Sequence, residues 1–240
     1  MVDKIHEMER IEVLRTNHLQ TIVVLAMSAD GKIADIQSSA ARFGSTFDKA
    51  HLEKQIASVD GVLFGAGTLR AYGTTLMVSD PELLKQRELQ GKESQPIHIV
   101  CSASGKIDPE LRFFQQQVPR CLFTTIKGSQ FWQQKRAFHK VFAIETVEGG
   151  INWVAAWEKL TEMGLQKVAV LGGGKLVASL LAADLVDEFW LTVCPLILGG
   201  ENAPTPVAGA GFLANLAPKL QLLSVERIDQ EVFLHYRLQR

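Results

Sequence analysis

The residues best suited to chemistry in this chain are three consecutive glycines followed by a lysine. Gly172, Gly173 and Gly174 come directly after the apolar run at residues 168–171, and Lys175 follows them. Glycines at the start of a helix let a ligand approach main-chain N–H groups, where the helix dipole favours phosphate. The stretch therefore predicts a pyrophosphate cradle. The alternative is a tight strand-to-helix turn that binds nothing.

A second glycine turn occurs earlier in the chain. The apolar run at residues 61–64 ends at Gly65-Ala66-Gly67-Thr68, before a short predicted helix that contains Leu69. Two strand–glycine–helix units that face each other across a sheet favour a dinucleotide more strongly than one unit does.

A polar segment follows the first buried strand, which is predicted at residues 21–27. It reads Ser28-Ala29-Asp30-Gly31-Lys32. Asp-Gly is turn chemistry, so one interpretation is a simple turn. The functional interpretation places these side chains at the carboxyl end of a strand, where open α/β sheets bind ligands. Asp30 is then the best carboxyl candidate for a proton donor, with Lys32 as its phosphate or proton partner.

The elements that position these residues are about eight strands and four helices. Early strands alternate with helices, and residues 219–227 and 231–238 form a hairpin that turns at residues 228–230, which predicts a mostly parallel α/β sheet with an antiparallel C-terminal edge. One helix is expected after Thr46 or Asp48 as its cap, and another after Asn152. The polar residues 82–95 are predicted to be a surface insertion.

Composition narrows the class of protein. The 240 residues include 25 basic and 26 acidic ones, for a net charge of −1, so a nucleic-acid partner is not expected. No apolar run reaches the roughly 18 residues of a membrane helix, and the N-terminus resembles no signal peptide. Cys101, Cys121 and Cys194 lie in or beside apolar runs, which predicts buried thiols in a reducing cytoplasm. A charged arm at residues 1–18 precedes a single domain at residues 19–240.

The motifs together resemble a known family. Residues 26–32, 60–68 and 170–200 match, in order and spacing, the reductase domain of the bacterial riboflavin-pathway deaminase–reductase, which has the dihydrofolate-reductase-like fold. The resemblance implies NADPH, a homodimer, and hydride transfer to a phosphoribosylamino-pyrimidine, 5-amino-6-(5-phosphoribosylamino)uracil, to give the ribitylamino product. The chain lacks the H-x-E and P-C-x-x-C motifs of zinc deaminases, so only the reductase step and no metal are expected.

The resemblance also assigns roles by position. Met27 and Ser28 would lie beside the nicotinamide, and Asp30, Lys32 and Leu76 near the substrate. The remaining cofactor contacts would be Thr68, Ser102, Gly172, Gly173, Gly174, Lys175, Leu176, Val177, Ala178 and Ser179. Ser102, Ser104 and Lys106 follow a strand and could donate to a 2′-phosphate, which predicts a preference for NADPH over NADH.

The chain departs from the family on its substrate side. Tyr72 stands where the family has an Asp-Asp-Pro turn, Ser79 and Ile56 (or Ala57) stand where it has arginines, and Leu171 stands where it has a glutamate. Three alternatives therefore remain. They are a same-fold NADPH reductase of another pyrimidine or pteridine, a dihydrofolate reductase, and a non-catalytic nucleotide-binding protein.

Overall fold

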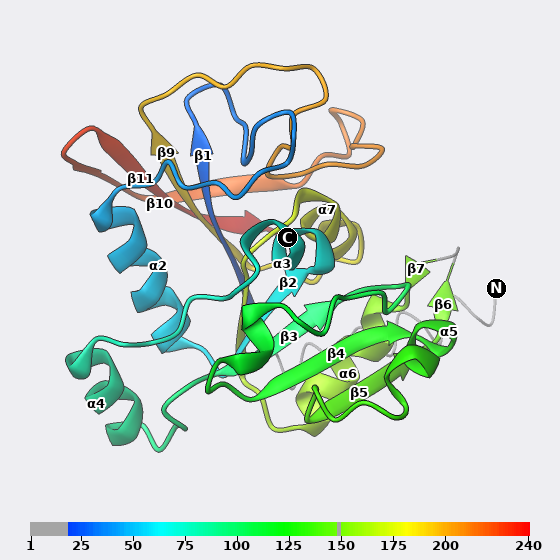
Figure 1. Ribbon diagram of the computed structural model, residues 1–240. Helices are drawn as coiled ribbons and strands as arrows, with labels where there is room; N and C mark the ends of the chain where they lie inside the picture. Colours follow the sequence, from blue (N-terminus) through cyan, green and yellow to red (C-terminus); the bar gives the residue numbers. More distant parts are fainter. Residues whose placement is uncertain (1–18, 148–149) are drawn as a thin grey trace.

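A computed structural model describes residues 19–147 and 150–240 (Figure 1). The predicted arm at residues 1–18 lies outside the described residues. Nine strands form one sheet in the order β10-β11-β9-β1-β8-β2-β3-β4-β5, one more than the sequence predicts. They are β1 (Gln20–Ser28), β2 (Gly61–Gly65), β3 (Ile97–Cys101), β4 (Arg120–Thr125), β5 (Lys140–Ile144), β8 (Lys167–Val170), β9 (Glu188–Cys194), β10 (Lys219–Ile228) and β11 (Glu231–Gln239).

The sheet is parallel from β9 to β5, and the C-terminal hairpin adds β11 and β10 in an antiparallel arrangement, as predicted. Asp229 forms the hairpin turn with a φ of 55°. A separate antiparallel pair consists of β6 (Thr146–Val147) and β7 (Gly150–Ile151).

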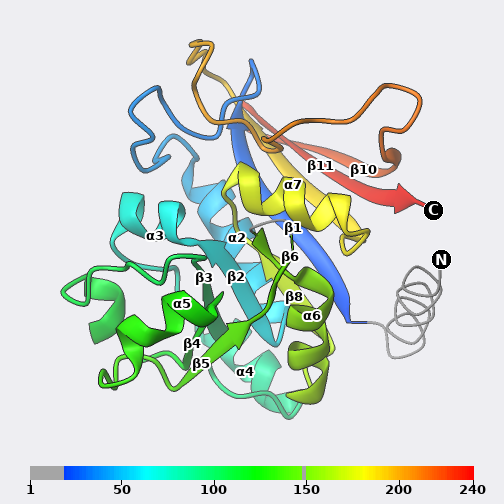
Figure 2. The same cartoon turned by 90° about the vertical axis from the view of Figure 1, so that its right-hand side faces the viewer.

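Helices cover both faces of the sheet (Figures 1 and 2). On one face, α6 (Trp153–Glu162) and α7 (Gly174–Ala182) bury their apolar side chains in one core. On the other face, α2 (Thr46–Ser58) and α3 (Ala66–Tyr72) contribute to a second core, and α4 (Pro81–Leu89) contacts α2. Short helical turns follow β3 and β4, namely η1 (Arg112–Gln115), α5 (Ile126–Ser129) and η2 (Gln130–Trp132).

The helix caps show what the sequence resolves and what it misses. Asn152 caps α6 as predicted, because its side chain accepts a hydrogen bond from the Ala155 N–H at 3.1 Å. The expected cap of α2 at Thr46 or Asp48 is wrong by one to three positions. Ser45 is the cap, since its hydroxyl accepts from Phe47 N–H and Asp48 N–H.

Residues 82–95 are not merely a surface insertion. Most of α4 lies in this segment, and Arg87 is 2% exposed. Its guanidinium donates to the carbonyl oxygens of Ala57 and Val59, each at 2.8 Å, where α2 ends. A buried cation that satisfies main-chain carbonyls fixes α4 against α2, which no local sequence pattern predicts.

The strand order brings the loops of interest together. The chain passes from β1 to β2, continues outward to β5, and returns to insert β8 between β1 and β2. The carboxyl ends of β1, β8, β2 and β3 therefore lie side by side at one edge. In open α/β sheets, such a reversal of strand order is where ligands bind.

Candidate cofactor and substrate site

The two glycine turns meet at this edge of the sheet. The Gly65 N–H donates to the Gly172 carbonyl at 3.0 Å, which ties the end of β2 to the end of β8. Thr68, on the first turn of α3, faces the same point, and a Cβ on Gly173 would lie 3.5 Å from its Oγ1. The turns therefore face each other, as the sequence predicts.

Each glycine of the second turn has a different role. Gly172 has a φ of 107°, which favours glycine, whereas Gly173 has an ordinary φ of −77° as the N-cap of α7. Gly174 packs against the Thr205 carbonyl, which leaves no room for a Cβ. Because Leu176 N–H and Val177 N–H both donate to Gly173, the N–H groups that α7 offers to a ligand are those of Gly174 and Lys175.

The later residues of the predicted cradle contribute little by their side chains. Leu176 and Val177 are buried in the core, and the Ser179 hydroxyl donates to the Lys175 carbonyl at 2.9 Å within the helix. Ala178 is half-buried one turn from the start of α7. The cradle is thus a main-chain site centred on residues 172–175, with exposed Lys175 as its charge.

Ser102 lies directly after β3, the strand next to β2 and its glycine turn. It is 7% exposed, and its N–H donates to the Phe123 carbonyl. The Gly105 carbonyl accepts from the Trp132 indole at 2.6 Å, and Gly105 has a φ of 64°. The loop is therefore held in one shape, with Ser104 and Lys106 exposed on it.

The polar segment after β1 is hydrogen-bonded to the loop that follows β9. The Asp30 carboxylate accepts from the Ser28 hydroxyl at 2.5 Å, from Leu198 N–H at 3.1 Å and from Gly199 N–H at 2.7 Å. The Ser28 hydroxyl, followed by these two main-chain donors, lowers the pKa of Asp30 to about 2. A carboxylate that three hydrogen bonds hold in its ionised form is a weaker proton donor than a free carboxyl group.

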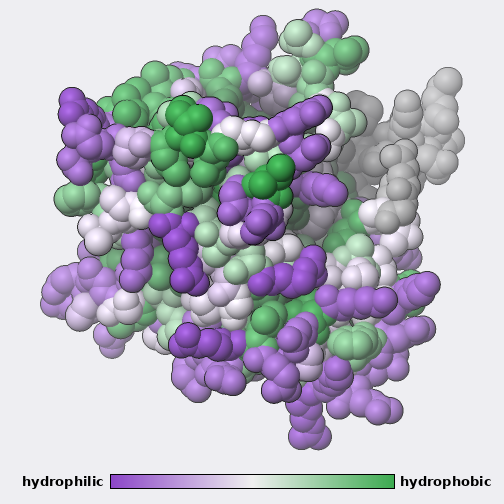
Figure 3. Space-filling model, turned by 45° about the horizontal axis from the view of Figure 1, so that its top comes forward, coloured by the Kyte–Doolittle hydropathy of each residue, from purple (hydrophilic) through white to green (hydrophobic). Residues whose placement is uncertain are grey.

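The loops after β1 and β9, which Asp30 joins, border the candidate site. Lys32 is half-exposed beside Asp30 and has no ion-pair partner within residues 19–147 and 150–240. Ile36 and Ile197 are 68% and 73% exposed on the two loops. Figure 3 shows hydrophobic patches among hydrophilic residues at this end of the molecule. Met27 is half-buried at the end of β1, opposite Val193 of β9.

At the positions where the resemblance places the family's arginines, the structure shows no cation. Ile56 and Ala57 are buried in the core. Ser79 donates to Glu53 through both its N–H and its hydroxyl. Leu171 and Leu76 are half-buried against the same core, so they offer apolar surface.

Two carboxyl groups, those of Asp48 and Glu231, lie close together, and the sequence analysis assigns neither of them to a site. Asp48, on the first turn of α2, is half-buried and hydrogen-bonds to the Thr192 hydroxyl of β9. Burial and the charge of Glu231 raise the pKa of Asp48, although its hydrogen bond to Thr192 lowers it. The first-turn position was visible in the sequence. That Asp48 lies close to Thr192 of β9 and Glu231 of β11 depends on the fold.

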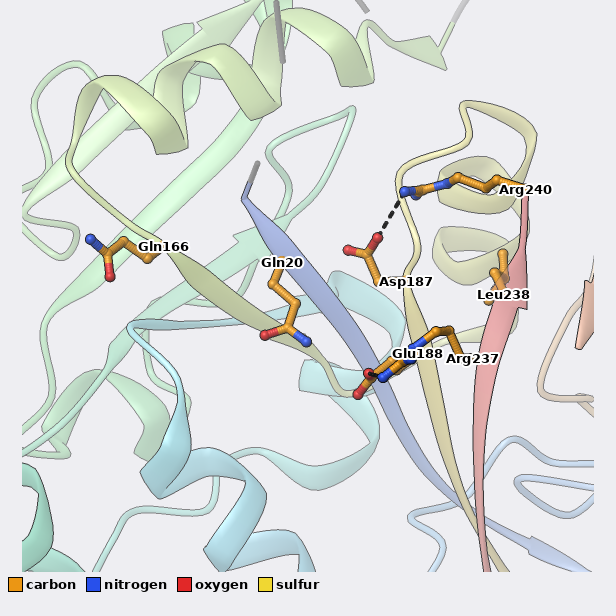
Figure 4. A pocket seen from close by; sticks show the side chains of 7 residues that line it. All are labelled: Gln20, Gln166, Asp187, Glu188, Arg237, Leu238 and Arg240. Carbon is orange, nitrogen blue, oxygen red and sulfur yellow. Dashed lines mark hydrogen bonds and ion pairs between the residues drawn. The ribbon is translucent and has the colours of Figure 1, made fainter. Parts of the chain in front are cut away.

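A polar cavity of about 530 Å³ lies at the opposite edge of the sheet (Figure 4). Its lining includes Gln20 and Glu188, which begin β1 and β9, and an ion pair of 3.0 Å joins Arg240 to Asp187. The cavity is therefore remote from the glycine turns. Within the described part of the chain, no cluster of three His, Cys, Asp or Glu side chains could hold a metal ion.

The sheet order and the C-terminal hairpin define the dihydrofolate-reductase-like fold. The family model described as the RibD C-terminal domain matches residues 20–234. The chain therefore belongs to the RibD C-terminal domain family, as the sequence motifs predict.

Known proteins resemble the chain over most of its length. A protein of Archaeoglobus fulgidus named 2,5-diamino-6-ribosylamino-4(3H)-pyrimidinone 5′-phosphate reductase is 27% identical, with 91% of this chain and 97% of the relative covered. The riboflavin biosynthesis protein RibD of Actinobacillus pleuropneumoniae is 25% identical, and the match covers 93% of this chain but 58% of that protein.

Solved structures share the fold. A pyrimidine reductase-like protein of Corynebacterium diphtheriae gives a TM-score of 0.77 at 19% identity, with 95% of each chain covered. A dihydrofolate reductase of Enterococcus faecalis gives a TM-score of 0.50 at 11% identity, with 92% of this chain and 97% of that chain covered. None of the helices in the described residues is long and apolar enough to cross a membrane.

Proposed function

We propose that the chain is an NADPH-dependent reductase that converts a 6-ribosylamino-pyrimidine 5′-phosphate into its ribitylamino product in riboflavin biosynthesis. The observation that carries the proposal is the meeting of the two glycine turns at the point where the strand order reverses. The curated relatives that match along nearly their whole length are named for this type of reduction.

The chain fits a dinucleotide at this edge. The predicted contacts lie on neighbouring strands in the order in which an extended cofactor would meet them. Met27 and Ser28 end β1 beside the nicotinamide, residues 172–175 follow β8 at the pyrophosphate, and Thr68 follows β2. Ser102, with Ser104 and Lys106, follows β3 at the adenosine 2′-phosphate. The fit rests on the cradle, because a side chain on Gly173 would occupy the space that faces Thr68.

The reaction needs positioning more than protein acids. A bound nicotinamide supplies a hydride. In the substrate, the ribosyl C1′–O4′ bond breaks, C1′ receives the hydride and O4′ takes a proton. Lys32 is the cation at the edge of the site and binds the phosphate or donates that proton. Asp30 holds the loops after β1 and β9 together and acts as a positioning residue.

Two ring systems fit this reaction. The sequence resemblance names the uracil compound, and a structural neighbour from Thermotoga maritima is described as a 5-amino-6-(5-phosphoribosylamino)uracil reductase. The archaeal relatives are named for the 2,5-diamino-4(3H)-pyrimidinone. The two substrates differ at ring position 2, and the same reduction of the sugar applies to both.

The test is steady-state oxidation of NADPH by purified protein with each pyrimidine phosphate, and identification of the product by mass spectrometry. We expect one ribityl product per NADPH consumed, at a rate on the order of 1 per second or faster with at least one substrate. Dihydrofolate is the matched negative control. Turnover of dihydrofolate with neither pyrimidine reduced would replace this proposal with the dihydrofolate reductase alternative.

We also propose a homodimer formed through the C-terminal hairpin. A register shift between Leu222 and Ser224 keeps Leu220, Leu222 and Val225 on one face of the edge strand β10, where they are 42%, 51% and 57% exposed. Exposed Phe212, Leu213 and Leu216 precede this strand. An apolar face on an edge strand requires a cover, and a second copy supplies one of equal shape.

Light scattering tests the dimer directly, with an expected mass of twice 26.5 kDa at micromolar concentration. Leu222→Lys places a charge on the apolar face and should yield monomers. Gln221→Lys, on the opposite face of the same strand, is the matched control and should remain dimeric. A wild-type mass of 26.5 kDa would refute the proposal. We further propose the cytoplasm as the location, since Cys101, Cys121 and Cys194 are buried free thiols.

A further inference from the structure

The loop at residues 29–45 joins the end of β1 to the start of α2 without regular secondary structure. It carries Lys32 at the edge of the candidate site. Its first part is held by Asp30, which accepts from two N–H groups of the loop after β9. A segment with little regular structure opens locally unless contacts hold it, so the far end of this loop needs an anchor as well.

That anchor is Glu231, the first residue of β11 in the C-terminal hairpin. Glu231 is 3% exposed, and its carboxyl group accepts from the Ser45 N–H at 2.8 Å and from the Ser45 hydroxyl at 2.5 Å. The same hydroxyl caps α2, since it accepts from Phe47 N–H and Asp48 N–H. Glu231 therefore fixes the residue at which the loop ends and the helix begins.

The same carboxyl group also contacts the start of the second loop that borders the site. The thiol of Cys194, the last residue of β9, donates to Glu231 at 3.5 Å. In the loop that follows, the Leu196 carbonyl accepts from the Ala29 N–H at 2.9 Å, which joins the two loops. Glu231 thus lies where the loop after β1 ends and where the loop after β9 begins.

The burial of Glu231 makes these contacts strong constraints. Among residues 19–147 and 150–240, no ion pair involves Glu231, and its hydrogen-bond partners are Ser45 and Cys194. A buried carboxyl group costs free energy when its donors leave it. Movement of Ser45 away from Glu231 would remove two of these donors at once, so the contact opposes opening of the loop.

We propose that Glu231 is a positioning residue for substrate binding, because it anchors the loop that carries Lys32 to the C-terminal hairpin. The proposal rests on the proposed function, in which Lys32 binds the substrate phosphate or donates a proton. Asp30 and Glu231 hold the two ends of the loop. The Tyr72 hydroxyl holds a point between them, since it donates to the Ala41 carbonyl at 2.8 Å.

The kinetic test compares Glu231→Ala with wild type in the reduction of the pyrimidine phosphate. We expect KM to rise about 5- to 10-fold, because substrate binds only the fraction of molecules in which the loop is closed. We expect kcat to change less than about 3-fold, since the bound substrate holds the loop in place. NADPH affinity should stay within about 2-fold of wild type, because the cradle at residues 172–175 follows a different strand.

Two further variants show whether the contact itself matters. Glu231→Gln keeps an acceptor for the Ser45 N–H and should retain a KM within about 3-fold of wild type. Glu226→Ala is the matched control, because it removes an exposed carboxyl group from β10 of the same hairpin. It should leave KM unchanged.

Trypsin cleavage measures the loop itself, without any use of activity. Arg42 is exposed within the loop and is a cleavage site for trypsin. We expect cleavage after Arg42 to be about 5-fold faster in Glu231→Ala, because the loop opens more often. Ser45→Ala should be intermediate, since it loses the hydroxyl but keeps the N–H contact. Glu226→Ala should match wild type, and a thermal melt of each sample shows that it is folded.

The outcomes separate the two levels of proposal. Wild-type KM and a wild-type cleavage rate in folded Glu231→Ala overturn the positioning role. Equal losses of substrate and NADPH affinity with unchanged cleavage after Arg42 overturn it as well, because they show a general structural effect. If Glu231→Ala does not fold, Ser45→Ala decides by the same two measurements. Reduction of neither pyrimidine by wild type overturns the proposed function and the positioning role with it, while the cleavage rates still show whether Glu231 anchors the loop.

Discussion

The proposed site has a cofactor half and a substrate half, which are built from different parts of the chain. The cofactor half is a main-chain surface, in which Gly65, Gly172 and Gly174 bring backbones close together. The proposed substrate half is a side-chain surface, in which Lys32, Leu76 and Leu171 arrive from three loops. A site made of main-chain groups tolerates substitution of most neighbouring residues, whereas a site made of side chains changes with each substitution. The substrate half can therefore change its ligand while the cofactor half keeps the same one.

The largest expected effect breaks the cofactor half. Gly173→Asp puts a carboxylate against the pyrophosphate, and we expect NADPH affinity to fall about 100-fold or more. Since Gly173 has a φ of −77° and a Cβ would lie 3.5 Å from Thr68 Oγ1, the variant should fold. Fluorescence titration and a thermal melt on one sample measure both quantities. Unchanged affinity in a folded variant would remove the turn from the site.

Substitution of the neighbouring Gly172 should lower the stability of the fold, in contrast to substitution of Gly173. Gly172→Ala forces a Cβ onto a φ of 107° and places it 3.2 Å from Leu25. We expect the free energy of unfolding to fall by about 1–3 kcal/mol. Urea denaturation measures this change, with Gly173→Ala as the matched control that should stay within about 0.5 kcal/mol of wild type. Equal losses in the two variants would contradict the assigned backbone roles.

The far end of the cofactor half should set cofactor choice. Lys106→Ala removes the exposed cation beside Ser104 after β3, and we expect the preference for NADPH over NADH to fall about 3- to 10-fold. The ratio of the two dissociation constants measures it, and Lys127→Ala serves as a control from the next loop. A preference that persists in Lys106→Ala would place the 2′-phosphate elsewhere.

The smallest effect is expected at Asp30, which holds the loops after β1 and β9 together. Asp30→Asn weakens the contact to Leu198 and Gly199, so kcat/KM should fall less than about 10-fold, against the 10²-fold or more expected for a lost general acid. The pH–rate profile from pH 5 to 9 should keep its shape. Because the pKa is lowered from 3.8 to about 2, the contact stabilises the fold above pH 3.8 and is lost as the pH falls through 2. A new limb near neutral pH would contradict this account.

The same contrast explains what the sequence could predict. Buried strands, glycine turns and the hairpin are local patterns, and all were placed within a few residues. The cap of α2 and the burial of Arg87 were missed because each depends on partners beyond the local pattern. The contacts of Asp30 with the N–H groups of Leu198 and Gly199 could not be predicted, because these donors lie 168 and 169 residues away along the chain.

A crystal structure of the wild-type protein with bound NADPH tests the central claim most directly, because the claim is an order of contacts along one sheet edge. We expect the nicotinamide beside Met27 at the end of β1, the pyrophosphate within hydrogen-bond distance of the N–H groups of Gly174 and Lys175, and the 2′-phosphate beside Ser102. A pyrophosphate away from residues 172–175, or a nicotinamide at the β3 end, would contradict the account.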